Sequence, residues 1–182
     1  EEGGEAPKTV FFINFSDPAQ NDFAIAEEVT IVGENTKRHD LVVYVNGIAL
    51  AVIELKRSSI SVSEGIRQNL TNQKAYCIEK FFTTMQFCMA GNDSEGFTEF
   101  PQERCETDVL IEEKSKDIEN LLDKQLFAMF YKKRFLDLIH NFIIFDKGIK
   151  KVCRYNQYYA IKRAQYRLTE EKRGGIIWHT QG

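Results

Sequence analysis

The sequence predicts an α/β fold in which a sheet, built around one β-hairpin, is flanked by helices. The first observation is the stretch 38–56 (RHDLVVYVNGIALAVIELK), in which two apolar runs flank Asn46-Gly47, a residue pair that strongly favours a tight hairpin turn. The second is the capping-box spacing of Ser61 and Glu64, which indicates the start of a helix. The third is an i, i+3, i+4, i+7, i+8 apolar stripe within 133–145, typical of an amphipathic helix.

The remaining elements follow from local composition. Because they are rich in β-branched and aromatic residues, we expect further strands over 9–15, 23–32, 83–90 and 174–182. We expect helices over 61–80, 118–131, 133–145 and 154–167. In the first helix, Ile66, Leu70 and Cys77 are expected to face the core. Residues 91–117, rich in glycine and charge, are expected to form an irregular connection.

Composition excludes several classes of protein. The 182 residues are 43% hydrophobic and 28% charged, which is ordinary for a globular protein, and the net charge of −3 does not favour a general nucleic-acid binder. Apolar runs stay well below the ~18 residues that span a membrane. The four cysteines form no CxxC pair, which favours reduced thiols and a cytoplasmic location over a zinc site or a disulfide framework.

Basic residues gather near the end of the sequence. Residues 147–173 contain nine lysines and arginines against two glutamates. Such an excess can follow a phosphate backbone. A solvated helix face with long amphipathic side chains gives the same pattern, and the sequence alone does not decide between the two.

Three polar side chains mark the ends of the predicted hairpin. Asp40 opens its first strand, and Glu54 and Lys56 close its second strand, two residues apart and therefore on one face. Two neighbouring carboxylates repel each other unless a cation lies between them, and Mg²⁺ needs only one or two protein carboxylates. A lysine beside them can orient an attacking water and stabilise charge on a phosphate. The alternative is a solvated strand end with Asp40 capping a turn.

This hypothesis has a geometric requirement. A regular hairpin closed at Asn46-Gly47 pairs Val45 with Ile48 and Asp40 with Ile53, which puts Asp40 and Glu54 on opposite faces. The two acids can share a face only if the hairpin contains a three-residue loop or one bulge, with Gly47 in the left-handed region.

Asp40, the 13 residues after it, and then Glu54-Leu55-Lys56 resemble the PD-(D/E)xK nuclease motif, with His39 where that family usually has proline. The runs RHDLVVYVNGIALAVIELK, EGIRQ, RYNQYYAIK and RGGIIWHTQG, in this order, resemble the restriction (R) subunit of type I restriction-modification enzymes. The resemblance extends from about residue 10 to the end and is weakest between Gly96 and Ile118.

The resemblance implies a restriction-endonuclease-like mixed sheet flanked by helices and followed by a helical linker segment. It divides the sequence into an endonuclease domain (1–100), a loop and helical linker (101–173) and the first strand of a RecA-like motor domain (174–182). The implied activity is Mg²⁺-dependent hydrolysis of double-stranded DNA after ATP-driven translocation by the full-length subunit. The implied partners are the methyltransferase and specificity subunits.

Carried over residue by residue, the resemblance makes Asp40 and Glu54 metal ligands and Lys56 the residue that positions water. Gln68 matches the glutamine of a Q-x-x-x-Y motif, which the resemblance implies helps to hold the catalytic site and the DNA, but the tyrosine position is Asn72. The alternative for Gln68 is an exposed helix residue. Gln157 matches an adenine-reading glutamine; otherwise it is a helix-surface amide. A phosphate-binding loop needs Gly-Lys-Ser/Thr after the strand, and the sequence contains none there, so we expect an incomplete ATPase site.

Two other functions remain open at this point. The hairpin can be structural, with the helices docking the R subunit onto a methyltransferase core; the missing upstream acid of the family pattern and Asn72 favour this alternative. The sequence can also be another PD-(D/E)xK nuclease, such as a resolvase or repair enzyme, against which only the RGGIIWHTQG run argues.

Overall fold

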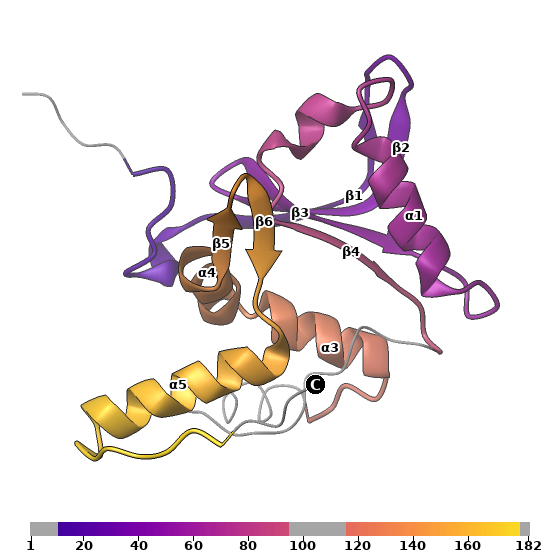
Figure 1. The fold of residues 1–182 in the computed structure, drawn as a ribbon. Helices are drawn as coiled ribbons and strands as arrows, with labels where there is room; N and C mark the ends of the chain where they lie inside the picture. Colours follow the sequence, from indigo (N-terminus) through magenta and orange to yellow (C-terminus); the bar gives the residue numbers. More distant parts are fainter. Residues whose placement is uncertain (1–10, 95–115, 179–182) are drawn as a thin grey trace, which may run out of the picture.

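The fold is a mixed α/β structure centred on a four-stranded sheet, as expected. In the computed structural model, residues 11–94 and 116–178 are described. The sheet has the order β1-β2-β3-β4, with β1 at Phe23–Ile31, β2 at Lys37–Val45, β3 at Ile48–Leu55 and β4 at Phe87–Gly91. The first three strands are antiparallel neighbours, and β4 lies parallel to β3 (Figure 1).

The central hairpin contains the bulge that the two-acid hypothesis requires. Asn46 and Gly47 have φ values of 50° and 77°, so both lie in the left-handed region that the tight turn between twisted strands needs. Val45 pairs with Ile48, whereas the pairing shifts by one residue further along and leaves Leu50 as the extra residue of β3. Continued to the strand ends, the shifted register sets Asp40 opposite Glu54.

Helices cover both faces of the sheet, which explains why β2 and β3 are so apolar (Figure 1). Helix α1 (Val62–Asn72) and the 3-10 helix η2 (Glu79–Thr83) lie on one face. Helices α3 (Leu121–Phe130) and α4 (Lys132–Asn141) lie on the other face, and α5 (Tyr155–Thr169) packs beyond them. A short hairpin of β5 (Ile143–Asp146) and β6 (Ile149–Val152) joins α4 to α5.

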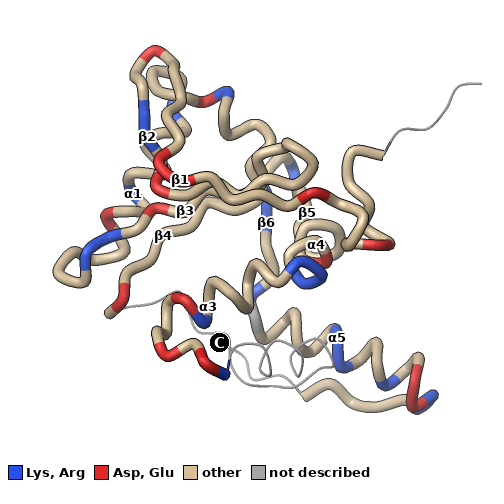
Figure 2. The backbone as a smooth tube through the Cα atoms, turned by 180° about the vertical axis from the view of Figure 1, so that it is seen from behind, with Lys and Arg blue, Asp and Glu red and all other residues tan. Residues whose placement is uncertain are grey.

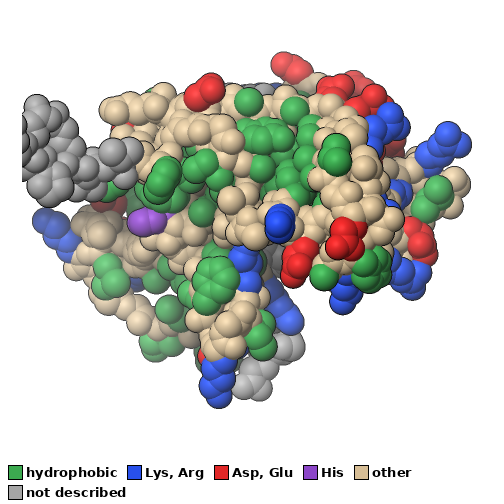
Figure 3. Space-filling view, turned by 90° about the horizontal axis from the view of Figure 1, so that it is seen from above, with side chains coloured by type: hydrophobic (Ala, Val, Ile, Leu, Met, Phe, Trp, Pro, Cys, Tyr) green, Lys and Arg blue, Asp and Glu red, His purple; other side chains and the backbone are tan. Residues whose placement is uncertain are grey.

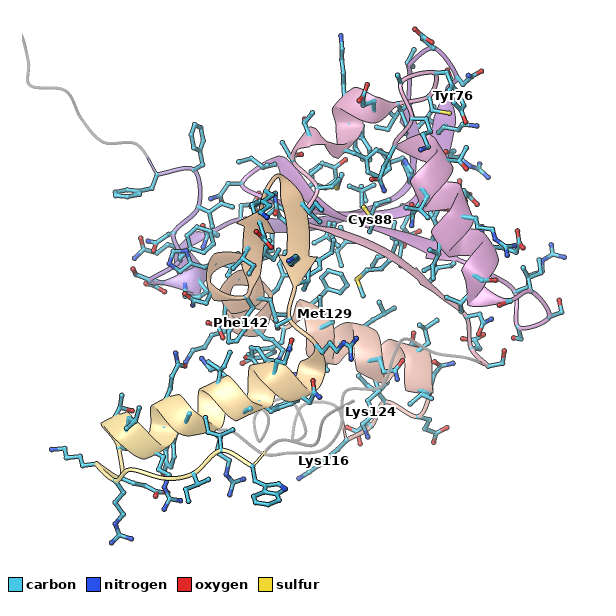
Figure 4. The ribbon with its side chains drawn as sticks, in the orientation of Figure 1. Tyr76, Cys88, Lys116, Lys124, Met129 and Phe142 are labelled. Atoms are coloured by element: carbon cyan, nitrogen blue, oxygen red, sulfur yellow. The ribbon has the colours of Figure 1, made fainter. Side chains whose placement is uncertain are left out.

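The two faces carry separate cores. On the α3–α4 face, alternate sheet residues pack with residues of all three later helices; the core comprises Val43, Val45, Leu50, Ala51, Ile53, Phe87, Met129, Phe135, Leu136, Leu138, Phe142, Tyr158 and Tyr159. Met129 and Phe142 lie between the sheet and α5 (Figure 4). The smaller core on the α1 face comprises Val42, Val52 and Met85, with Phe81 and Phe82 packed against it.

The helices after residue 116 therefore share a core with the sheet. The proposed division at residues 100 and 173 stays a prediction.

Helix α1 differs from its prediction. Ser61 is the N-cap and accepts a hydrogen bond from the Ser63 N–H, but the helix ends at Asn72, not near Lys80. The expected apolar stripe is wrong for Ile66 and Leu70, which are 50% and 56% exposed, whereas Cys77 is buried but lies beyond the end of the helix. The buried face of α1 is Gly65, Asn69 and Asn72. Small and amide side chains suit this contact because α1 lies close to the sheet, where the Asn69 amide donates to the backbone oxygen of Met89.

Three other predictions are corrected. The described part of the predicted strand 9–15 is irregular, with Phe11 and Phe12 largely exposed. The predicted helix 133–145 ends at Asn141, because Lys147 and Gly148 form a second left-handed turn pair and fold 143–152 into a hairpin. Residues 174–178 form no strand, and Ile176 and Trp178 are more than nine-tenths exposed. Residues 179–182 lie outside the described residues.

Several cations of the basic segment are bound within the fold. The Lys150 ammonium donates to the backbone oxygen of Met85, and Lys162 pairs with Asp137 at 3.1 Å. Lys151 pairs with Asp146. Just beyond the end of α5, two glutamates lie between Arg167 and the basic pair Lys172-Arg173 (Figure 2). Part of the positive charge of residues 147–173 is therefore already paired with acidic side chains of this chain and is less available to a phosphate.

The surface mixes apolar and charged side chains. Hydrophobic side chains reach the surface in the middle of one face, with charged residues at its rim (Figure 3). Within residues 11–94 and 116–178, no helix has the length and hydropathy needed to cross a membrane.

Candidate functional site

The candidate site lies where β2 and β3 end beside α1, and Glu54 is its centre. Glu54 is only 1% exposed, and burying a carboxylate costs free energy unless it is paired or hydrogen-bonded. Its Oε1 lies 2.7 Å from His39 Nδ1, and its Oε2 accepts a hydrogen bond of 2.7 Å from Gln68 Nε2. A buried carboxylate needs such donors, because an unpaired one would lose its hydration without replacement.

Gln68 joins Glu54 to Lys56. Its amide nitrogen donates to Glu54, while its Oε1 accepts a 2.6 Å hydrogen bond from Lys56 Nζ. The direct distance from Lys56 Nζ to Glu54 Oε2 is 3.9 Å, too long for a hydrogen bond. The amide therefore acts as a spacer that holds the ammonium, 19% exposed, beside the buried carboxylate. Glu54 and Lys56, predicted on one strand, and Gln68, predicted on the following helix, form one cluster.

Asp40 lies beside this cluster on the neighbouring strand. Its Oδ2 accepts a 2.7 Å hydrogen bond from the backbone N–H of Leu55, the residue between Glu54 and Lys56. The bond fixes the Asp40 carboxylate against the end of β3 and leaves its Oδ1 without a hydrogen bond to a described residue. The bulge at Leu50 is the reason that Asp40 and the Glu54–Lys56 segment meet at one edge of the hairpin.

His39 is the site residue that sequence reasoning missed. The side chain is fully buried, its ring stacks on Phe81 at 5.2 Å, and Phe82 contacts it edge-on at 5.8 Å. Successive side chains of a strand point to opposite faces of the sheet, so His39 and Val42 would be expected on opposite faces. Both nevertheless pack against Phe81 and Phe82. The ladder between β1 and β2 skips the pair opposite Asp40, where Glu28 has a positive φ of 51°. The register is the same on both sides of this gap, and the available sequence signal for His39 was the histidine in place of proline.

Gly65 sets the distance between α1 and the sheet. A Cβ at this position would lie 2.7 Å from the Cβ of Ala90, 3.4 Å from Lys56 Cε and 3.6 Å from Glu54 Cβ. Only glycine lets the helix backbone come this close. Gln68 follows almost one turn later on the same face, so the close approach places its amide within reach of Glu54 and Lys56.

The donor set fits a hard divalent cation. Glu54 has one donor on each carboxylate oxygen, and a carboxylate offers about four acceptor positions, so unused lone pairs remain. Oxygen ligands from one or two carboxylates, completed by water, are what Mg²⁺ takes. Among the described residues there is no group of three or more histidine, cysteine or acidic side chains that could hold a metal, so a cation here would depend on one or two carboxylates and water.

The other residues carried over by resemblance lie apart from this cluster. Asn72, at the tyrosine position, is buried at the end of α1, where its backbone oxygen accepts the Ile78 N–H. Gln157 is exposed in the first turn of α5, and its Oε1 accepts the backbone N–H of Arg154, as in a capping box. An adenine contact by Gln157 stays a prediction.

Comparison with known proteins identifies the family. The family model described as the type I restriction enzyme R protein N terminus matches residues 1–98, more than half of the chain. The MjaVIIIP type I restriction enzyme endonuclease subunit of Methanocaldococcus jannaschii is 30% identical over 98% of this chain and 19% of its own length. The HindI endonuclease subunit of Haemophilus influenzae is 26% identical over 100% of this chain and 19% of its own length.

The chain thus spans about a fifth of the length of these curated relatives. The matched region contains the bulged hairpin, α1 and the Glu54–Gln68–Lys56 cluster. Together, the family match and the mixed α/β fold place the chain in the family of type I restriction enzyme R protein N-terminal regions.

Proposed function

We propose that this chain is the endonuclease part of a type I restriction enzyme subunit and hydrolyses phosphodiester bonds of double-stranded DNA with Mg²⁺. The observation that carries the proposal is the cluster of Glu54, Gln68 and Lys56 at the end of a bulged hairpin, with Asp40 fixed beside it. Relatives named as type I restriction enzyme endonuclease subunits support the nuclease role.

Each side chain has a defined part in this reaction. Asp40 and Glu54 bind the cation through carboxylate oxygens that their present hydrogen bonds leave unused. When bound, Mg²⁺ supplies positive charge that offsets the charge developing on the phosphate and favours ionisation of the attacking water. Lys56 orients that water through its ammonium group, and Gln68 holds Lys56 in place. Burial of Glu54 keeps competing water away from one side of the site.

The wider assembly belongs to the same proposal. We expect cutting to follow ATP-driven translocation by the full-length subunit in the cytoplasm, with methyltransferase and specificity subunits as partners. Sequence recognition would then lie outside this chain, in keeping with its net charge of −3.

The test is Lys56→Ala in the intact restriction complex. Double-strand cutting of an unmodified plasmid should fall by roughly 10²–10⁴-fold, because the ammonium acts on the attacking water. ATP hydrolysis should persist, because its machinery lies elsewhere. Lys74→Ala is the matched control, since Lys74 is an exposed lysine at the end of α1. Cutting by Lys56→Ala at the wild-type rate would refute the role of Lys56.

A non-catalytic docking module is the second candidate. The observation that favours it is the exposed apolar surface of α1 and the turn after it: Ile66, Leu70 and Tyr76 are each at least half exposed, and Tyr76 points away from the sheet (Figure 4). A docking module predicts that Leu70→Ser weakens assembly with the partner subunits in a pull-down, while Lys56→Ala leaves cutting intact. The nuclease proposal predicts loss of cutting by Lys56→Ala with assembly retained.

A further inference from the structure

The side chain of His39 has no part in the mechanism above, yet it makes the shortest contact of the Glu54 Oε1 atom. Its Nδ1 lies 2.7 Å from that oxygen, and both side chains are essentially excluded from solvent. The His39 Nε2 is also buried and makes no hydrogen bond to a described residue. A fully buried imidazole with one partnered nitrogen needs an explanation, because an unpaired buried polar atom costs free energy.

The proposed role of Glu54 as a metal ligand fixes the direction of this hydrogen bond. A carboxylate that binds a cation is ionised and can only accept, so Nδ1 carries the hydrogen and donates to Glu54. In the neutral ring, Nε2 then presents a lone pair and not an orphaned N–H to its surroundings, where Phe81 and Phe82 pack around the imidazole. The two phenyl rings hold the plane of the imidazole, so the donor has a fixed position.

From these contacts we propose that His39 is a positioning residue for Glu54: its Nδ1–H holds Oε1 so that the carboxylate is already oriented for a divalent cation. Gln68 holds Oε2 in the same way, at 2.7 Å, so both oxygens are fixed from separate elements, β2 and α1. A free glutamate loses rotamer freedom when it binds a metal, and donors that fix it beforehand remove part of that cost.

This role is specific to the residue type at position 39. Proline, which stands here in the PD-(D/E)xK pattern that the sequence resembles, has no side-chain donor and could not hold Oε1. The positioning of Glu54 by two side chains is therefore a feature of this chain's own residues. The inference rests on the proposed function, because it assumes that Glu54 is a metal ligand.

The experiment measures Mn²⁺ affinity of the intact subunit by titration calorimetry or electron paramagnetic resonance, without nucleotide and at one fixed pH. A variant with Asp40→Asn and Glu54→Gln gives the background from other sites. His39→Phe and His39→Leu remove the donor but suit the aromatic surroundings, and should weaken Mn²⁺ binding by about 10–100-fold. His39→Asn places an amide N–H near the position of Nδ1 and should restore binding close to that of the wild type.

Chemical denaturation of the same variants separates this role from a purely structural one. The apolar variants should be less stable than His39→Asn, because they leave the buried Glu54 Oε1 without its donor, and the denaturation curves show which variants are folded. Among the folded variants, positioning predicts that Mn²⁺ affinity depends on a donor at position 39, whereas a structural role predicts equal Mn²⁺ affinities.

The outcomes are distinguishable from failure of the proposed function. If the wild type binds Mn²⁺ no better than the variant lacking Asp40 and Glu54 carboxylates, the metal site is refuted and this inference falls with it. If that difference exists but His39→Phe and His39→Leu bind like the wild type, or His39→Asn binds as poorly as they do, only the role of His39 is overturned.

Discussion

Replacing Gly65 by alanine tests how closely α1 must approach the sheet. The added Cβ would meet the Cβ of Ala90 at 2.7 Å, whereas ordinary contacts of this kind begin at 3.4 Å. Ala90 lies on β4, which is paired with β3, so the sheet side of the contact is held firmly. Relief of the overlap requires α1 to move outward by roughly 0.7 Å if the sheet does not yield.

The same movement lengthens the two hydrogen bonds that join Gln68 to Glu54 and Lys56. Its hydrogen bonds to Glu54 Oε2 and from Lys56 Nζ are 2.7 and 2.6 Å long, and an outward shift of that size takes both to the limit of hydrogen bonding. A misplacement on the order of 1 Å can cost about 10²-fold in rate, so we expect cutting to fall by about 10–100-fold. The free energy of unfolding should fall by about 0–2.5 kcal/mol, because alanine gains about 0.5–1 kcal/mol of helix propensity against a strain of about 1–3 kcal/mol.

The assay is double-strand cleavage of an unmodified plasmid by the intact complex, with chemical denaturation to measure stability. Ile66→Ala is the control, since Ile66 is the next residue of the same helix and is half exposed. Ala90→Gly removes the atom that the new Cβ would meet, so the double variant Gly65→Ala, Ala90→Gly should regain cutting relative to Gly65→Ala alone. Wild-type cutting by Gly65→Ala, or no recovery in the double variant, would refute the reasoning.

Two further predictions concern other parts of the chain. Burial raises the pKa of the Cys88 thiol on β4 (Figure 4) and the positive charge of Lys150 lowers it, so Lys150→Met should raise this pKa further. The thiolate fraction then falls, and alkylation of Cys88 by iodoacetamide near neutral pH, followed by mass spectrometry, should slow by up to about tenfold; an equal or faster rate would contradict this. Gln157→Ala removes the hydrogen bond to the Arg154 N–H and should lower the free energy of unfolding by about 0.5–1.5 kcal/mol, with Gln165→Ala as control. The KM for ATP of the intact subunit should rise as well if Gln157 contacts adenine, and an unchanged KM would leave it a capping residue only.

The parts of the fold predicted correctly are those decided by local chemistry. Asn46-Gly47 specifies its turn because both residues tolerate the left-handed region, and Ser61 caps α1 because its hydroxyl can accept a nearby N–H. The β5–β6 hairpin does not follow from hydrophobic periodicity, because the apolar residues up to position 145 predict a helix there, although Lys147-Gly148 carries a turn signal similar to that of Asn46-Gly47. Periodicity alone does not distinguish the end of a helix from the start of a short strand.

The apolar stripe of α1 failed for a different reason. Periodicity assumes that a helix buries its most hydrophobic face, but α1 packs through Gly65, Asn69 and Asn72 and exposes Ile66 and Leu70. Close approach to β3 and β4 excludes large side chains at that contact, so distance to the sheet, which the sequence does not contain, selected the buried face.

By itself the sequence indicated three residues of the candidate site and the geometric condition for bringing two acids together. Charge, spacing and turn chemistry are local properties, so Asp40, Glu54, Lys56 and the need for a bulge could be read from residue order. Only the tertiary structure decided that Leu50 is the bulged residue, that Gln68 bridges Glu54 and Lys56, and that His39 lies buried against Glu54. These contacts join residues of different elements, and their existence depends on how closely two strands and a helix pack, which no local pattern encodes.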